Sequence, residues 1–100
     1  MKLAWSPLAL DRVAEIARYI ANDDPAAAER WVNELFDAVA RLSEHPESGR
    51  VVPEIGVPRI RELSFGAYRV IYSVADRVEI LTVRRGSQLL DVGEIDDPSK

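Results

Sequence analysis

The residues of this chain best suited to chemistry are arginines that cluster in its second half. They are Arg59, Arg61, Arg69, Arg84 and Arg85. A guanidinium group binds a carboxylate or phosphate through paired, fixed hydrogen bonds, which lysine cannot copy. Gathered on one surface, these groups would suit a phosphate backbone or an acidic partner protein. The alternative is a set of internal ion pairs with Glu62, Glu79 and the acidic tail, and spacing alone leaves both readings open.

Other kinds of site have little support in the sequence. His45 is the single histidine and there is no cysteine, whereas zinc sites and serine or cysteine triads need such groups in combination. The five glycines are scattered singly, so no phosphate-binding loop is present. We therefore expect no metal and no cofactor.

The elements that must position the arginines are three consecutive strands between Arg59 and Gly86. Tyr68, Val70 and Tyr72 alternate with Arg69 and Ile71, which is the period of two of a strand with two different faces. Gly66 and the Asp76-Arg77 pair mark the connections. Arg69 should project from the face opposite the helices, with Arg61 on the preceding strand and Arg84 or Arg85 on the following strand close to it.

Two amphipathic helices are expected before this sheet. Ser6-Pro7 and Asp24-Pro25 each combine a capping side chain with a proline suited to the first helical position. Apolar residues then recur at three- and four-residue spacing. The stripe of the first helix is Val13, Ile16, Ala17 and Ile20, and that of the second is Ala28, Trp31, Val32, Leu35, Val39 and Leu42. The short link between them indicates an antiparallel hairpin.

The order of elements predicts a single α+β domain over residues 1–100. Lys2–Trp5 is a short candidate strand, and residues 50–58 are interpreted as a loop that crosses back to the sheet. A helical hairpin covers one face of a small, mainly antiparallel sheet. The other face is expected to be uncovered and to present Ile71, Leu81 or Val83 beside the arginines as a docking surface. The tail after Gly86 could be a final short element or an extended arm.

Composition and charge narrow the classes of function. The chain is 47% hydrophobic and 30% charged with a net charge of −4, which is typical of a globular protein and argues against general nucleic-acid affinity. Residues 48–86 nevertheless carry seven arginines against four carboxylates. No apolar run reaches the roughly 20 residues that cross a bilayer, and no secretory signal is evident. We expect a cytoplasmic protein without membrane contact.

Several short motifs, in order, resemble the ParE/RelE superfamily of type II toxins over about residues 3–90. They are Trp5-Ser6-Pro7, Asp24-Pro25-Ala26-Ala27-Ala28, His45-Pro46-Glu47-Ser48-Gly49-Arg50, Arg61-Glu62-Leu63, Tyr68-Arg69-Val70-Ile71-Tyr72 and Val83-Arg84-Arg85-Gly86. The resemblance implies a β-α-α-β-β-β fold and a cognate antitoxin that wraps the toxin. RelE-like members cut mRNA in the ribosome, whereas ParE-like members poison DNA gyrase.

Within the superfamily, this chain resembles the ParE-like branch more than the RelE-like one. The RelE-like set includes lysines before the sheet and a histidine or aromatic residue near the C-terminus, yet residues 48–68 lack lysine and no histidine or tyrosine follows Gly86. Arginine is a poor acid or base for cutting a phosphodiester. We therefore predict a gyrase-inhibiting toxin rather than an enzyme, with a ParD-like ribbon-helix-helix antitoxin as partner and DNA contacted only through that antitoxin.

The predicted site follows from this choice of branch. The residues expected to bind the target or the antitoxin are Arg61, Arg69, Ile71, Arg84 and Arg85. In the ribonuclease alternative, the catalytic candidates would be Arg69, Arg84 and Arg85. A decayed toxin that serves only as a corepressor partner is a third possibility.

Overall fold

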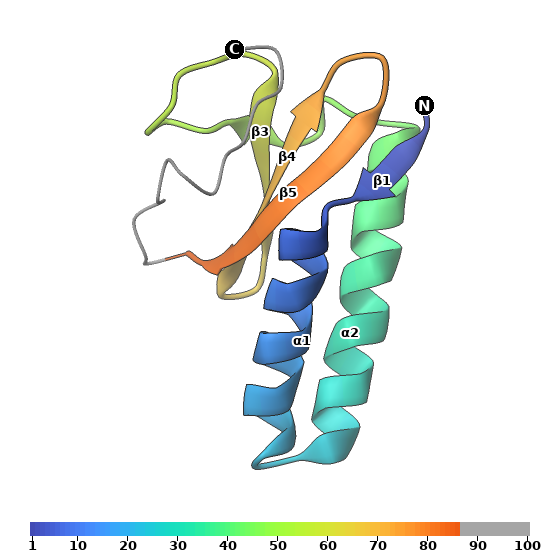
Figure 1. Ribbon diagram of the computed structural model, residues 1–100, viewed down its shortest axis with the longest axis vertical. Coiled ribbons are helices and arrows are strands. Elements are labelled where there is room, and N and C mark those ends of the chain that lie inside the picture. The colour runs from blue at the N-terminus through green and yellow to red at the C-terminus, as the bar shows by residue number, and fades with distance from the viewer. Residues whose placement is uncertain (87–100) are drawn as a thin grey trace.

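Two helices lie on one face of a five-stranded sheet in the computed structural model, which describes residues 1–86 (Figure 1). The described elements run in the order β1 (Leu3–Trp5), α1 (Pro7–Ala21), α2 (Pro25–Ala40), a 3-10 turn (Arg41–Ser43), β2 (Arg50–Val51), β3 (Ile60–Phe65), β4 (Tyr68–Val74) and β5 (Val78–Arg85). The expected α+β fold is confirmed. The prediction missed β2, two residues inside the segment interpreted as a loop, and the 3-10 turn that holds Leu42 after the end of α2.

The helices begin at the two serine- or aspartate-proline pairs. Ser6 Oγ accepts a hydrogen bond from the Ala9 amide at 3.0 Å, and Asp24 Oδ1 accepts one from the Ala27 amide at 3.1 Å. Pro7 and Pro25 take the first helical positions, where a missing N–H costs nothing. Ser6 Oγ also donates to the Leu81 carbonyl at 2.9 Å, so the cap joins α1 to β5.

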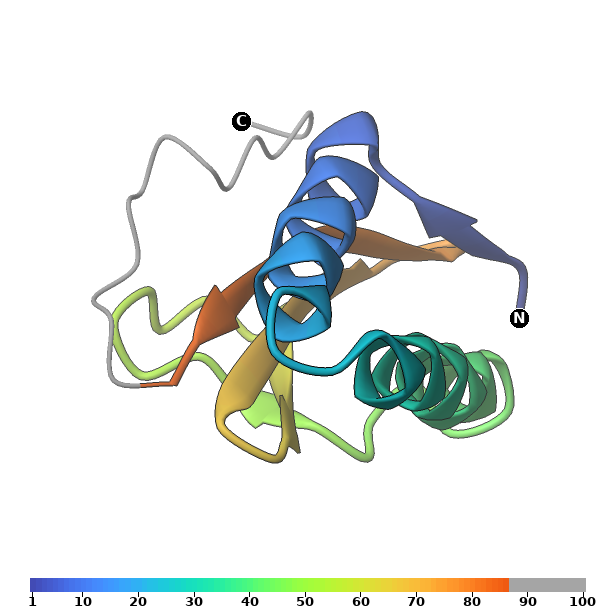
Figure 2. The same cartoon turned by 90° about the horizontal axis from the view of Figure 1, so that it is seen from below.

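The sheet has the spatial order β1-β5-β4-β3-β2. β1 pairs parallel with β5, and every other neighbouring pair is antiparallel. β5 carries an irregularity opposite Ile71 and Tyr72, where its register with β4 shifts. α1 and α2 run side by side, and the end where they connect extends beyond the sheet (Figures 1 and 2).

The larger core lies between the helices and the sheet. Buried side chains of α1, α2 and the 3-10 turn meet those of β4 and β5 there, namely Ala9, Val13, Leu35, Val39, Leu42, Val70, Tyr72, Val78, Ile80 and Val83. Part of each predicted helical stripe therefore packs against the sheet, namely Val13 and Ile16 of the first and Trp31, Val32, Leu35, Val39 and Leu42 of the second. No helix of residues 1–86 is long and apolar enough to cross a membrane.

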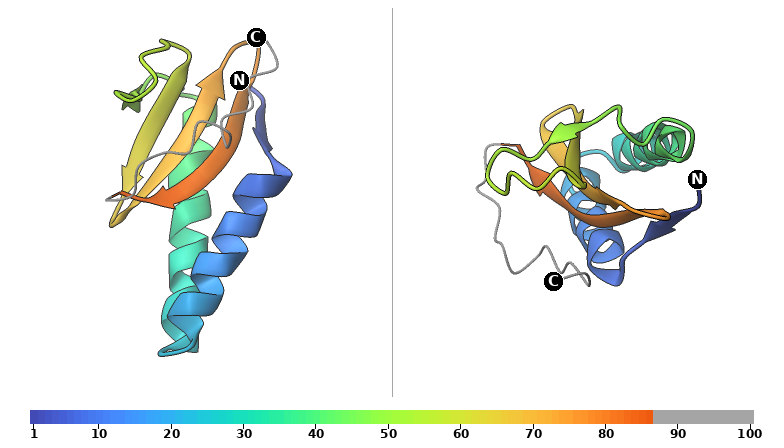
Figure 3. Two further views of the ribbon diagram at one scale, coloured as in Figure 1. Left: turned by 60° about the vertical axis from the view of Figure 1, so that its left-hand side comes forward. Right: turned by 90° about the horizontal axis from the view of Figure 1, so that it is seen from above.

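The opposite face of the sheet has a second, smaller core. Val52 joins Ile60, Ile71 and Leu81 there, and Ile55 and Val57 pack against them. Ile71 is fully buried and Leu81 is 4% exposed. The segment between β2 and β3, on the left in both views of Figure 3, therefore folds over this face. The expectation of an uncovered face that presents Ile71 and Leu81 is wrong, because this segment carries three apolar side chains that need burial themselves. Val83 faces the helices instead.

Candidate functional site

Arg69, the central candidate, is held inside a network of ion pairs. Its Nη1 and Nη2 donate to Glu54 Oε2 and Oε1 at 2.7 and 2.9 Å, and its Nε donates to Glu62. Glu62, 3% exposed, also accepts from Arg50 Nε through its other oxygen. Arg69 itself is 9% exposed. Its guanidinium therefore ties the covering segment, through Glu54, to β3 and β4.

This network favours the charged forms of Glu54 and Arg69. The hydrogen bond from Arg69 holds the pKa of Glu54 below its usual value, against the opposing effect of burial. The hydrogen bond to Glu54 likewise raises the pKa of Arg69, with Glu62 adding to it. A guanidinium that is already a very weak acid thus becomes weaker still. Arg69 cannot give or take a proton in a reaction near neutral pH.

Arg61 lies apart from Arg69 and contacts a different part of the chain. Its cross-strand partner is Tyr72, whereas Arg69 pairs with Ser64 on that side. Arg61 Nη1 donates to the Gly49 carbonyl at 2.9 Å. The Tyr72 hydroxyl donates to the Pro46 carbonyl at 2.8 Å and accepts from the Gly49 amide at 2.9 Å. Arg61 therefore helps to anchor the loop after α2, and the expectation that it lies beside Arg69 is wrong.

Arg84 and Arg85 lie at the far end of β5. Arg84 is the direct cross-strand partner of Arg69, as the sequence predicted for one member of the pair, and Arg85 is the partner of Tyr68. Because neighbouring residues of a strand point to opposite faces, Arg85 projects on the side of the helices. Arg85 is exposed and Arg84 is half-buried.

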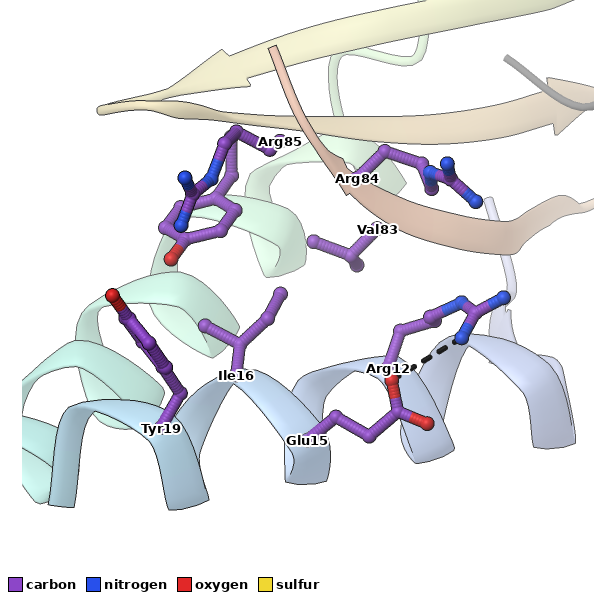
Figure 4. Close-up of a pocket in the computed structure, with 8 residues that line it drawn as sticks. Arg12, Glu15, Ile16, Tyr19, Val83, Arg84 and Arg85 are labelled. Atoms are coloured by element: carbon purple, nitrogen blue, oxygen red, sulfur yellow. Dashed lines mark hydrogen bonds and ion pairs between the residues drawn. The ribbon is translucent and has the colours of Figure 1, made fainter. Parts of the chain in front are cut away.

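A groove of about 390 Å³ separates this end of β5 from α1 (Figure 4). We call it the α1–β5 groove; it is lined by Arg12, Glu15, Ile16, Tyr19, Tyr68, Val83, Arg84 and Arg85. Figure 4 shows the α1 side chains Ile16 and Tyr19 reaching up toward Val83 and Arg85. Arg12 donates to Glu15 Oε2 at 3.2 Å. The lining of the α1–β5 groove thus contains three arginines and one carboxylate.

The predicted residues therefore do not form one site. Ile71 is buried, Arg69 and Arg61 are engaged inside the protein, and Arg84 and Arg85 line the groove. Sequence reasoning missed Glu54, which lies in the apparent loop, and the groove residues Arg12, Tyr19 and Tyr68. The interpretation of internal ion pairs is confirmed for Arg69 and Glu62. Among residues 1–86, no cluster of potential metal ligands occurs.

Comparison with known proteins assigns this chain to a family. Residues 3–90 match the family described as the ParE toxin of the type II toxin-antitoxin system parDE. The chain belongs to this family. It is a ParE-like type II toxin, and the superfamily expected from its motifs is confirmed.

Two curated relatives of this ParE-family toxin cover most of its length. The Y4kP protein of Sinorhizobium fredii, named as a candidate toxin, is 40% identical over 87 residues, which cover 87% of this chain and 90% of the relative. Toxin RelE2 of Caulobacter vibrioides is 33% identical over 90 residues, which cover 88% of this chain and 98% of the relative. One of these relatives thus carries a RelE name, although the family model that the chain matches is that of ParE toxins.

Two solved structures share the fold of this ParE-family toxin. The chromosomal ParDE system from P. aeruginosa matches with a TM-score of 0.71 at 24% identity, covering 85% of this chain and 95% of that one. The toxin-antitoxin complex RelBE2 from Mycobacterium tuberculosis matches with a TM-score of 0.57 at 18% identity, covering 86% and 92%. At such identities the likeness establishes the fold alone.

Proposed function

We propose that this ParE-family chain inhibits DNA gyrase, that it is not an enzyme, and that a ParD-like antitoxin neutralises it. The family match over residues 3–90 supports the ParE-like branch. A gyrase target places the protein in the cytoplasm. Its contact with DNA would then be indirect, through the antitoxin.

The observation that carries this proposal is the engagement of Arg69 by Glu54 and Glu62. Cutting RNA requires one group to activate the 2′-hydroxyl and another to protonate the leaving oxygen. Arg69, the central catalytic candidate of the ribonuclease alternative, is buried, permanently charged and already bound to two carboxylates. That arrangement supports a structural role for Arg69 rather than a role as acid or base.

The antitoxin is the second part of the proposal. Two solved structures with this fold are a ParDE system and a RelBE2 toxin-antitoxin complex, which supports an antitoxin as the partner of this chain. The ParE family model favours a ParD-like partner with a ribbon-helix-helix domain.

The runner-up is a ribosome-dependent endoribonuclease, which the 33% identity to Toxin RelE2 favours. In that function Arg84 and Arg85, at the mouth of an open groove, are better placed than Arg69 to contact RNA. A chain that acts only as a corepressor partner is the third alternative.

One experiment separates the three functions. Purified toxin is added to gyrase supercoiling and cleavage assays, and in parallel to translating ribosomes with a primer-extension readout. Gyrase inhibition with intact mRNA supports the proposal. Codon-positioned mRNA cuts with normal gyrase activity would establish the ribonuclease instead. Folded protein without effect in either assay would favour the corepressor.

A further inference from the structure

The α1–β5 groove combines cationic side chains with an open volume of about 390 Å³, which has room for a ligand side chain. We propose that this groove receives an acidic, partly apolar peptide segment of the antitoxin, with Arg85 as its principal charged contact. This inference rests on the proposed function, because it names the place where the neutralising partner binds.

Charge is the first argument for such a segment. The groove gathers three arginines and one glutamate in a chain whose net charge is −4. Arg85 is exposed and forms no ion pair with another residue of the described part of the chain. A carboxylate that approaches it would therefore gain a charge-assisted hydrogen bond without first displacing a partner among residues 1–86.

The shape and lining of the groove supply the second argument. Ile16 and Val83 form an apolar floor, and the ring of Tyr19 lies beside it (Figure 4). Tyr68 also lines the groove. Tyr19 is 63% exposed, which makes it the most exposed large apolar side chain among those the structure describes. Tyrosine offers a ring and a hydroxyl together, a combination that is enriched at protein interfaces. An aliphatic side chain would cover the floor while a neighbouring carboxylate reaches Arg85.

The other face of the sheet is a poorer choice for the same partner. Its apolar residues Ile71 and Leu81 are already buried beneath the segment that Glu54 ties down. A segment docking there would have to break the hydrogen bonds between Arg69 and Glu54. The α1–β5 groove needs no such opening, so the extended part of the antitoxin is assigned to it.

The test uses the protein encoded by the reading frame that adjoins the toxin gene, which is the candidate antitoxin. Isothermal titration calorimetry measures the binding of the whole toxin to this purified protein. Arg85→Glu should weaken binding by about tenfold or more, because it places like charges in contact, and the loss should shrink at high salt. Tyr19→Ala should weaken binding by a smaller factor. Arg30→Glu, an equal charge reversal on the exposed surface of α2, should change it less than about twofold. Thermal melts check that each variant folds.

A charge swap makes the assignment specific. When an acidic residue of the partner is changed to Arg, binding to the Arg85→Glu toxin should recover most of the loss, which a general effect on stability could not produce. Unchanged binding by Arg85→Glu overturns the inference. The inference is also overturned if Arg85→Glu binds the partner normally but loses another property of the unmodified toxin. Such a property could be binding to a 12-nucleotide RNA, self-association, or the stability of the isolated toxin. Those results would assign the groove to RNA, to a second copy or to the chain's own acidic tail. If the unmodified toxin does not bind the adjoining product at all, the antitoxin part of the proposed function fails as well.

Discussion

Arg69 donates two nearly parallel hydrogen bonds to Glu54, from Nη1 to Oε2 at 2.7 Å and from Nη2 to Oε1 at 2.9 Å. This paired contact joins a central strand to the segment that covers the second face of the sheet. Arg69 therefore holds the covering segment against the sheet.

The first prediction concerns the stability of the fold. Arg69→Ala leaves Glu62 buried with Arg50 alone and releases Glu54, so it should lower the free energy of unfolding by about 3–5 kcal/mol. Urea denaturation measures this loss. Arg77→Ala is the control, because its contact with Glu79 is exposed and should contribute less than about 1 kcal/mol. An Arg69→Ala protein with the original midpoint would show that the network does not stabilise the fold.

The second prediction follows from the lowered pKa of Glu54. A carboxyl whose pKa is lowered by folding stabilises the native state at pH values above its pKa in the unfolded chain, which is near 4.5. This contribution disappears as the pH falls through the lowered pKa of the folded state. The stability difference between the original protein and Glu54→Gln should therefore be largest near pH 7 and shrink as the solution is acidified toward pH 3. Urea titrations at several pH values measure it, with Glu34→Gln as an exposed control. A difference that does not depend on pH would contradict the paired contact.

The third prediction concerns Gly49. A Cβ at this position would lie 2.4 Å from the Glu62 carbonyl oxygen and 2.5 Å from the Tyr72 hydroxyl oxygen, both of which are held in place. Gly49→Ala should therefore destabilise the protein by about 1–3 kcal/mol through overpacking. Ser48→Ala, a change at an exposed neighbour, should cost less than about 0.5 kcal/mol. Equal melting temperatures for the two variants would show that the loop gives way without cost.

The fourth prediction uses the buried hydroxyl of Tyr72. Burial raises the pKa of this phenol above its usual value of 10.0, so the neutral form stabilises the fold below pH 10 and that contribution is lost as pH rises through the raised pKa. Absorbance at 295 nm should show one tyrosine that ionises at a higher pH than the others. This titration step should be absent in Tyr72→Phe. The same variant should lose about 1–3 kcal/mol, since the Gly49 amide is left without its acceptor. A titration curve that Tyr72→Phe leaves unchanged in shape would refute this.

Local sequence signals were sufficient to predict the helices and the three main strands. Ser6-Pro7 and Asp24-Pro25 define the helix starts through contacts within a few residues, which a sequence displays directly. The alternation around Arg69 and Ile71 likewise shows which residues share a face of β4. Each of these features depends on neighbours in the chain rather than on the tertiary fold.

The candidate site was less predictable because it depends on contacts between distant segments. Alternation identifies the face that Arg69 occupies, but it does not reveal that Val52, Ile55 and Val57 cover that face. Glu54 lies beside a proline in an apparent loop, and only the folded chain brings it to Arg69. The α1–β5 groove joins residues of α1 to residues of β5 in the same way. The predicted role of residues 87–100 concerns a part of the chain outside the described residues.

The most direct test of the central claim is a gyrase supercoiling assay with increasing amounts of the purified toxin. We predict that supercoiling falls as toxin is added and that it recovers when the antitoxin encoded by the adjoining reading frame is present. Full supercoiling activity at a large molar excess of folded, unmodified toxin would contradict the claim that gyrase is its target.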